Sequence, residues 1–382
     1  LGITRVTLPQ LPVIPLGIHT DDFKFSESEK VRAREALGID ENTLVVLYMG
    51  RLSFHAKSHP MAMYQALEIA AQQTTKKVVL VEAGWYANDY IQRAFQEAQK
   101  VCCPSVEVVH LDGRVESNRK IAWGCADVFC SLSDNIQETF GITPIEAMAA
   151  GLPVIVTDWD GYKDTVTDEV GFKIQTATPQ AGLGGDLAFR HAAQLDNYDF
   201  YCGHVCAFVS VAVEQCARKL VDLFRDEALR HRMGDAGRKR AEQYYDWSVV
   251  IPQYEELWAH LSALRLKHDR ISPEPWPARL DPFSSFAHYP TTQLSIESKV
   301  SRVDDRLDES IAKLSRLYDL EMVKFAHRTL PSKALLQNLL SDIHGRPIRV
   351  RELINPLTGQ QAALKLRALS VLLKLDLIRL LT

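Results

Sequence analysis

Two glutamates that flank a glycine-containing turn form the most distinctive chemical pattern of the chain. Glu138 and Glu146 enclose the segment Thr139-Phe-Gly-Ile-Thr-Pro-Ile145, which leads into an apolar run. Since proline is favoured in the first turn of a helix, Pro144 predicts that a helix begins near residues 141–143. The first backbone N–H groups of a helix lack partners within it and form an anion site. Carboxylates on both sides of such a site suit a ligand that carries hydroxyl groups on either side of its phosphates.

A second loop carries two cations that suit the same ligand. Gly50 ends the apolar run at 44–49, Arg51 follows it directly, and Lys57 comes six residues after Arg51. Glycine lets the backbone approach a ligand closely, arginine offers a planar fork of N–H groups, and lysine offers a point charge. Surface arginines and lysines are usually only solvated, so this loop alone is a weak indication of a diphosphate clamp. Together with the two glutamates, it indicates a nucleotide sugar.

Strands and helices alternate between residues 44 and 174 and would position both loops. Strands are expected at 44–49, 77–83, 106–111, 128–132, 153–157 and 171–174, and helices at 59–72, 90–101, 118–126 and 143–150. This alternation predicts the α/β class, with a doubly wound parallel sheet of the Rossmann-like kind. Ligands of such sheets sit at the carboxyl ends of the strands, which is where the two loops begin.

The pattern changes after the sixth predicted strand. Glycines and Pro179 predict a loop-like insertion at about 176–203, and a proline-punctuated segment at 272–277 predicts a linker. Further helices are expected at 208–224, 227–243, 249–264, 298–319, 333–344 and 364–381. The predicted organisation is a linker-like segment (1–24), a ligand-binding domain (25–264), a linker (265–297) and a mostly helical C-terminal extension (298–382).

Charge divides the chain into two unlike parts. Residues 1–264 carry 25 lysines and arginines against 35 acidic residues, whereas residues 265–382 carry 19 against 13. The net charge of −4 for the whole chain argues against a nucleic-acid partner, which usually requires a strong basic excess. The extension carries Lys365, Arg367, Lys374 and Arg379 among leucines. These residues fit either a core helix with solvated cations or a docking face for an acidic protein surface or a membrane.

The cysteines and the lengths of the apolar runs indicate the cellular compartment. The seven cysteines include the adjacent pair Cys102 and Cys103, which is typical of a reducing environment, and no uncharged apolar run reaches the ~18–20 residues that cross a bilayer. The expected location is cytoplasmic, with peripheral membrane contact as the alternative.

Two short patterns suggest metal ligands. The segment Cys202-Gly-His-Val-Cys206 has no second ligand pair nearby to complete a four-ligand zinc site, so ordinary packing is the better interpretation. Asp158-Trp-Asp160 spells a metal-binding triplet, but the Gly161 that follows favours a turn. No metal is expected.

Four segments in order give the chain a family resemblance. They are Val13-Ile-Pro-Leu-Gly-Ile-His-Thr-Asp-Asp-Phe23, the loop from Gly50 to Lys57, the paired glutamates in the run up to Pro153, and Leu229 to Ser248 with its Tyr245-Asp-Trp247. In these segments the chain resembles a retaining glycosyltransferase of family 4 with the GT-B fold, and mainly its C-terminal, donor-binding domain. The resemblance covers residues 10–264.

The resemblance implies a role for each candidate residue. Arg51 and Lys57 would stabilise the leaving diphosphate beside Gly50, and Glu138 would orient the donor sugar. Glu146 would bind the ribose hydroxyls. The backbone that would hold the sugar and phosphates belongs to Phe140, Gly141, Ile142 and Thr143, and Arg114 lies in the turn that would frame the base. The implied reaction is a metal-independent sugar transfer with retention of configuration and no cofactor.

The front of the chain departs from the family. Only about thirteen residues precede the linker-like motif, whereas the family has an N-terminal acceptor domain there. The expectation is that this chain carries the donor half and that the acceptor domain is absent from it. The alternative is a non-catalytic module that binds a nucleotide sugar or a protein partner.

Overall fold

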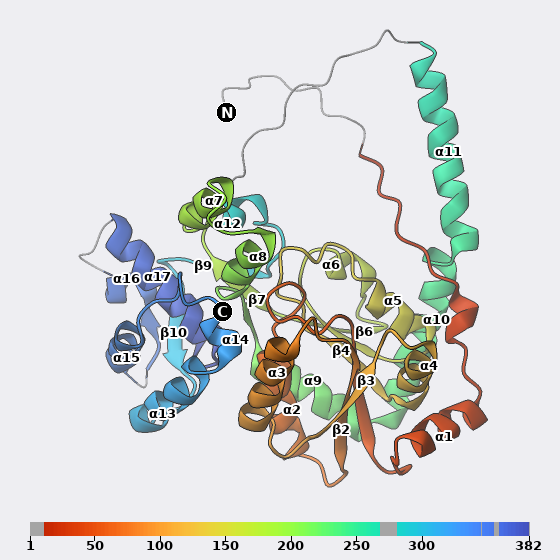
Figure 1. Cartoon of the computed structure of the whole chain (residues 1–382), viewed down its shortest axis with the longest axis horizontal. Helices are drawn as coiled ribbons and strands as arrows, with labels where there is room; N and C mark the ends of the chain where they lie inside the picture. Colours follow the sequence, from red (N-terminus) through yellow and green to blue (C-terminus); the bar gives the residue numbers. More distant parts are fainter. Residues whose placement is uncertain (1–10, 268–280, 345, 355–358, 382) are drawn as a thin grey trace.

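A six-stranded parallel sheet forms the centre of the molecule (Figure 1). The computed structural model describes residues 11–267, 281–344, 346–354 and 359–381. The strand order is β3-β2-β1-β4-β5-β6, with β1 (Leu44–Met49), β2 (Val78–Gly84), β3 (Glu107–Asp112), β4 (Val128–Ser131), β5 (Val154–Thr157) and β6 (Gly171–Ile174). The predicted α/β class with a doubly wound parallel sheet is confirmed.

Helices cover both faces of this sheet because alternate strand residues point to opposite sides. Val46 and Leu80 share one apolar cluster with α2 (Met61–Ala71), α3 (Asp89–Cys102) and α9 (Val213–Arg225). Val45 and Val79 belong to a second cluster on the other face. The helices of that face are α1 (Glu27–Ala36), α4 (Glu116–Cys125), α5 (Ile142–Ala149) and α10 (Glu227–Tyr244).

The segment predicted as a loop at 176–203 is instead largely regular structure, so that prediction is wrong. It contains β7 (Thr176–Pro179), α7 (Gly185–Ala192) and most of α8 (Tyr198–Cys206), with β8 (Ser210–Val211) following. The glycines form only the turn before α7. Helix α8 is capped by Asn197, whose side chain accepts a hydrogen bond from the N–H of Phe200.

The chain then leaves the body of the molecule through a long helix and returns to complete a second, three-stranded sheet. Helix α11 (Trp247–Arg265) projects from the body of the molecule (Figure 1), and only its start packs against residues 17–20. The predicted linker motif at 272–277 lies outside the described residues. After it come α12 (Pro282–Ser285) and β9 (Thr292–Leu294), which pairs in parallel with β7. Residues 292–294, predicted to belong to a linker, therefore form a strand of the β8-β7-β9 sheet.

The C-terminal extension is mostly helical, as predicted, and also contains a small sheet. Its helices are α13 (Leu307–Tyr318), α14 (Glu321–Lys324), α15 (Lys333–Asp342), α16 (Val350–Ile354) and α17 (Gly359–Lys374). Its strands are β10 (Lys299–Arg302), β11 (Ile348–Arg349) and β12 (Ile378–Leu381), in the order β11-β10-β12. The helices predicted at 298–319 and 364–381 were therefore too long. Asp376, in a left-handed conformation (φ 52°), follows α17 and separates it from β12. Two short helices complete the fold, η1 (Thr20–Phe23) and α6 (Tyr162–Thr165).

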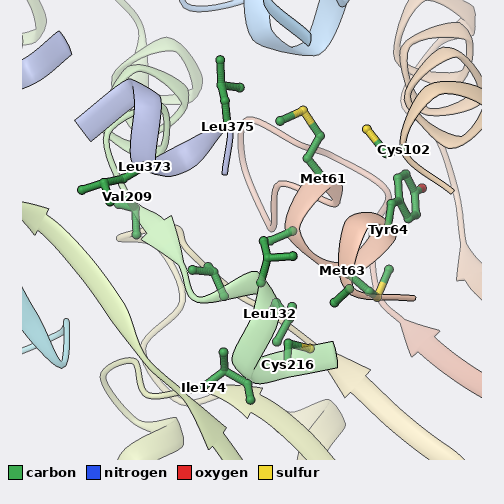
Figure 2. Packing of buried hydrophobic residues seen from close by; sticks show 14 of the residues in the cluster. Met61, Met63, Tyr64, Cys102, Leu132, Ile174, Val209, Cys216, Leu373 and Leu375 are labelled. Atoms are coloured by element: carbon green, nitrogen blue, oxygen red, sulfur yellow. The ribbon is translucent and has the colours of Figure 1, made fainter. Parts of the chain in front are cut away.

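One apolar cluster joins the extension to the central sheet. Figure 2 shows Leu373 and Leu375, at the end of α17, among the same buried side chains as Met61 of α2 and Leu132 beyond β4. The extension thus shares its core with the sheet. Among the residues that the structure describes, no helix combines the length and apolarity needed to cross a bilayer.

Candidate functional site

The loops that follow β1 and β4 lie against each other at the carboxyl edge of the sheet. Ser58 Oγ donates to the carbonyl of Leu132 at 3.0 Å, and Asn135 Nδ2 donates to the carbonyl of His55 at 2.9 Å. Their carboxyl ends meet because β1 and β4 are parallel neighbours in the sheet. Below, the β1 loop denotes residues 50–60 and the β4 loop residues 132–141.

A glycine on β2 lets the β1 loop start where it does. A Cβ atom on Gly84 would lie 2.0 Å from the carbonyl oxygen of Gly50. Any larger residue would displace the backbone at Gly50. The next residue, Arg51, is half-buried, and its Nη2 lies 3.4 Å from the carbonyl oxygen of Ala56.

Lys57 and Glu138 meet between the two loops. The ammonium of Lys57 lies 2.5 Å from Oε2 of Glu138, although the residues are 81 positions apart in the chain. Glu138 is buried with only 9% of its side chain exposed, whereas Lys57 keeps 36% of its side chain exposed. Lys57, predicted to bind phosphate, and Glu138, predicted to bind the sugar, therefore lie together at the carboxyl edge of the sheet.

The β4 loop ends at the N-terminus of α5, as predicted. Gly141 precedes this helix with a left-handed backbone (φ 73°), and no side chain caps its first turn. A Cβ atom at Gly141 would lie 1.9 Å from the ring of Tyr162. Because the first N–H groups of the helix are not bonded by a capping side chain, they keep the capacity to bind an anion.

The second glutamate is a half-buried residue of α5. Burial raises the pKa of Glu146 to about 7, and the positive charge of Arg119 opposes that shift. A carboxyl with such a pKa changes its charge near neutral pH. Its protonation state therefore depends on what approaches it.

Arg114 stands apart from these residues. It follows β3, which β2 separates from β1, and its guanidinium lies 2.7 Å from the carboxylate of Asp112. Gly113, beside it, donates its N–H to the carbonyl of Gly84 at 3.0 Å. The structure thus unites Lys57, Glu138 and the start of α5, while Arg114 occupies the outer end of the same edge.

A tyrosine that sequence reasoning missed lies behind the site. Tyr162 is fully buried, its ring abuts Gly141, and its hydroxyl is 3.4 Å from Oγ of Ser131. Burial and the neighbouring charge of Glu138 raise the pKa of this phenol. No spacing rule links Tyr162 to Glu138, so only the tertiary structure identifies it.

The carboxylates of the Asp158-Trp-Asp160 triplet are occupied by structural contacts. Asp158 accepts a hydrogen bond from the hydroxyl of Thr291 at 2.7 Å, and Asp160 lies 3.2 Å from the imidazole of His288. Trp159 is buried and donates its indole N–H to the carbonyl of Asn135. Within the described ranges, no group of three or more histidine, cysteine, aspartate or glutamate side chains has the arrangement of a metal site.

Comparison with known proteins finds a family model that matches part of the chain. Residues 29–182 match the family model described as "Glycosyl transferases group 1". A relative from Mycobacterium leprae, "Phosphatidyl-myo-inositol mannosyltransferase", is 33% identical over 151 residues, which are 39% of this chain and 30% of the relative. "Uncharacterized glycosyltransferase MJ1607" from Methanocaldococcus jannaschii is 26% identical over 212 residues, which are 52% of each chain. The chain thus spans about half or less of the length of these relatives.

The solved structures give a more distant likeness. One of them, Anabaena Alr3699/HepE in complex with UDP and glucose, is 19% identical with a TM-score of 0.45, and the match covers 66% of this chain and 56% of that one.

Proposed function

We propose that this chain, which carries a glycosyltransferase group 1 domain, binds a nucleotide sugar and serves as the donor-binding half of a retaining, family 4 sugar transferase of the GT-B type. Residues 25–264 would form the donor domain, and the acceptor would be bound outside them. The contact of Lys57 with Glu138 beside the uncapped start of α5 carries this proposal. It joins a phosphate-binding cation and a hydroxyl-binding carboxylate at the edge where doubly wound sheets bind ligands.

Each group at the site has a proposed role. Arg51 and Lys57 bind the diphosphate next to Gly50, and the backbone N–H groups at the start of α5 bind its oxygens. Glu138 accepts hydrogen bonds from the sugar hydroxyls, and Glu146 from the ribose. The backbone groups at the start of α5 belong to Phe140, Gly141, Ile142 and Thr143. Arg114 would lie by the base.

The proposed chemistry is stabilisation of a departing anion. When the bond between the sugar carbon and the diphosphate oxygen breaks, negative charge grows on the diphosphate, and the cations of Arg51 and Lys57 stabilise it. The acceptor oxygen bonds to the sugar carbon on the face that the diphosphate leaves, and its proton passes to the leaving phosphate. This scheme needs no metal ion and no cofactor.

Titration calorimetry tests the proposal directly. The chain is titrated with uridine, guanosine and adenosine diphosphates and with their sugar derivatives, in buffer containing EDTA. We expect one base to be preferred, with binding retained in EDTA. Arg51→Ala and Lys57→Ala should each weaken binding of the preferred nucleoside diphosphate by about 1.5–3 kcal/mol, which is the scale of hydrogen bonds to charged groups.

A control variant separates the clamp from general charge effects. Lys77→Ala removes an exposed lysine at the opposite end of the sheet, beside β2, where it pairs with Glu107. Its affinity should equal that of the unmodified chain. Binding that survives both clamp substitutions contradicts the roles of Arg51 and Lys57, and binding that needs a divalent ion contradicts the metal-independent mechanism.

A further inference from the structure

A lysine of the C-terminal extension reaches the back of the candidate site. Lys374 is the last residue of α17, and only 5% of its side chain is exposed. Its ammonium contacts the carboxylate of Asp134, whose side chain is 1% exposed. The two residues are 240 positions apart. Asp134 belongs to the β4 loop, four residues before Glu138.

Asp134 joins three segments of the chain. Its Oδ2 contacts Lys374 of α17, and its Oδ1 accepts the backbone N–H of His59 in the β1 loop at 3.0 Å. His59 lies two residues after Lys57. One buried carboxylate of the β4 loop therefore bonds to the β1 loop and to the extension.

The β4 loop is also bonded on its other side. The hydroxyl of Thr157, at the end of β5, donates to the carbonyl of Ser133 at 2.5 Å, and the indole of Trp159 donates to the carbonyl of Asn135 at 3.0 Å. Asp134 lies between Ser133 and Asn135 in the chain and contacts Lys374. The loop is therefore bonded to the end of β5, to Trp159 just beyond it, and to α17.

Burial makes the lysine a requirement of this arrangement. Burying an ionised carboxylate without a cation is costly, and the ammonium of Lys374, although burial lowers its pKa to about 7, lies where it stabilises the charge of Asp134. Apolar packing of Leu373 and Leu375 fixes the end of α17 next to Lys374 (Figure 2). The position of the β4 loop thus depends on a helix that belongs to the extension.

We propose that Lys374 is a positioning residue for the nucleotide-sugar site. It acts through Asp134, which sets the β4 loop and hence Glu138, and through His59 it sets the β1 loop and hence Lys57. This inference rests on the proposed function of that site. It assigns the C-terminal extension a part in donor binding that the extension performs without touching the donor.

The test uses Lys374→Met in the complete chain, with Arg379→Met as the matched control. Arg379 also belongs to the extension and pairs with Glu214 at 3.6 Å, but it lies on β12 and contacts neither loop. Hydrogen–deuterium exchange and titration with the preferred nucleotide sugar are measured for both. Since a misplaced side chain loses its hydrogen bond to the ligand, and a hydrogen bond to a charged group is worth about tenfold or more in affinity, we expect Lys374→Met to lose at least about tenfold in affinity.

Local exchange distinguishes positioning from general destabilisation. In Lys374→Met, exchange should rise in peptides covering 53–60 and 131–140 and stay unchanged in β2 and β3. Arg379→Met should leave the exchange of these loops unchanged, and it should change the affinity by no more than about twofold. Unchanged loop exchange and unchanged affinity in Lys374→Met would overturn the inference.

A double variant covers the case in which Lys374→Met does not fold. Asp134→Asn with Lys374→Met removes both buried charges and keeps an oxygen that accepts the N–H of His59. We expect its melting temperature to recover towards that of the unmodified chain, while the loss of affinity persists. Full recovery of affinity would mean that the pair serves stability alone. If the unmodified chain binds no nucleotide sugar, the proposed function fails, while the exchange data still decide whether Lys374 orders the loops.

Discussion

At the scale of single residues, the two glutamates of the site differ in surroundings. Glu138 is buried and bonded to Lys57 between the loops, whereas Glu146 lies inside α5 with a pKa that burial raises to about 7. Seven residues of chain separate them, and the start of α5 lies in between. They are therefore suited to opposite ends of an extended donor.

This difference predicts that the two carboxylates act on different parts of the ligand. Glu146→Gln should weaken binding of the bare nucleoside diphosphate. Glu138→Gln should leave that affinity nearly intact and weaken binding of the nucleotide sugar. The neutral amide loses the charge-assisted hydrogen bond to the sugar, which is about twice as strong as a neutral one. Calorimetric titration of both variants with both ligands measures the difference. Equal losses for the two ligands in both variants would contradict this division.

A second buried carboxyl makes stability depend on pH. Glu82, on β2, is fully buried and accepts hydrogen bonds from Tyr64 and Gln99, and burial raises its pKa from 4.5 to about 7. The unfolded chain therefore ionises this group at lower pH than the folded chain does. The resulting stabilisation is complete below about pH 4.5 and is lost as the pH rises to about 7.

Glu82→Gln should remove this pH dependence. The free energy of unfolding of the unmodified chain should fall, relative to that of the variant, by about 3 kcal/mol between pH 4.5 and 7. Urea unfolding at several pH values measures it. His110 lies 3.2 Å from the same carboxylate, so the difference between the two proteins reports the titration of Glu82 together with its coupling to His110. Glu107→Gln, on the exposed neighbouring strand, is the control, and parallel pH curves for the unmodified chain and Glu82→Gln would refute the prediction.

At the scale of elements, the start of α5 depends on Gly141. The sequence placed this glycine just before the helix but did not show why a larger residue would not fit there. Gly141→Ala combines a left-handed backbone with a Cβ atom 1.9 Å from Tyr162, so it should cost about 1–3 kcal/mol of unfolding free energy and weaken nucleotide-sugar binding. Gly185→Ala is the matched control, since no atom lies within 4 Å of a Cβ there and the residue begins α7. Urea unfolding compares the two. Equal stability of the two variants would show that the turn tolerates a side chain.

The sequence predicts elements well where the signal is local. The strands of the central sheet are apolar runs, continuous in β1 and interrupted by polar residues such as Glu82 in β2 and Lys173 in β6, and their places follow from the apolar residues. The start of α5 follows from Pro144 in the same way. By contrast, β9 forms a strand because it pairs with β7, which lies more than a hundred residues earlier in the chain. The motifs that carry Glu138 and Lys57 made them recognisable as candidate site residues, whereas the proposed role of Lys374 depends on a contact across 240 positions.

At the scale of the whole molecule, the charge asymmetry has a structural counterpart. Basic residues of the extension pair with acidic residues of the sheet domain, at distances up to 3.6 Å. The pairs are Arg328 with Asp196, Arg367 with Asp186, Arg379 with Glu214, and Lys374 with Asp134. The excess of acid before residue 265 and of base after it is therefore partly neutralised within the chain.

After α11 the chain returns to pair with β7, so contacts between elements, and not covalent continuity alone, hold the two stretches of the chain together. Strand β9 adds to β7, and α17 completes the core below the β4 loop, so the two stretches on either side of residues 268–280 are complementary pieces of one body. Residues 1–267 and 281–382, co-expressed as separate polypeptides, should reassemble and co-purify as a one-to-one complex. Nucleotide-sugar affinity should return only when both are present. If residues 1–267 alone bind the donor as tightly as the complete chain, residues 281–382 are dispensable for binding. The protein would then be unsuited to split-fragment complementation.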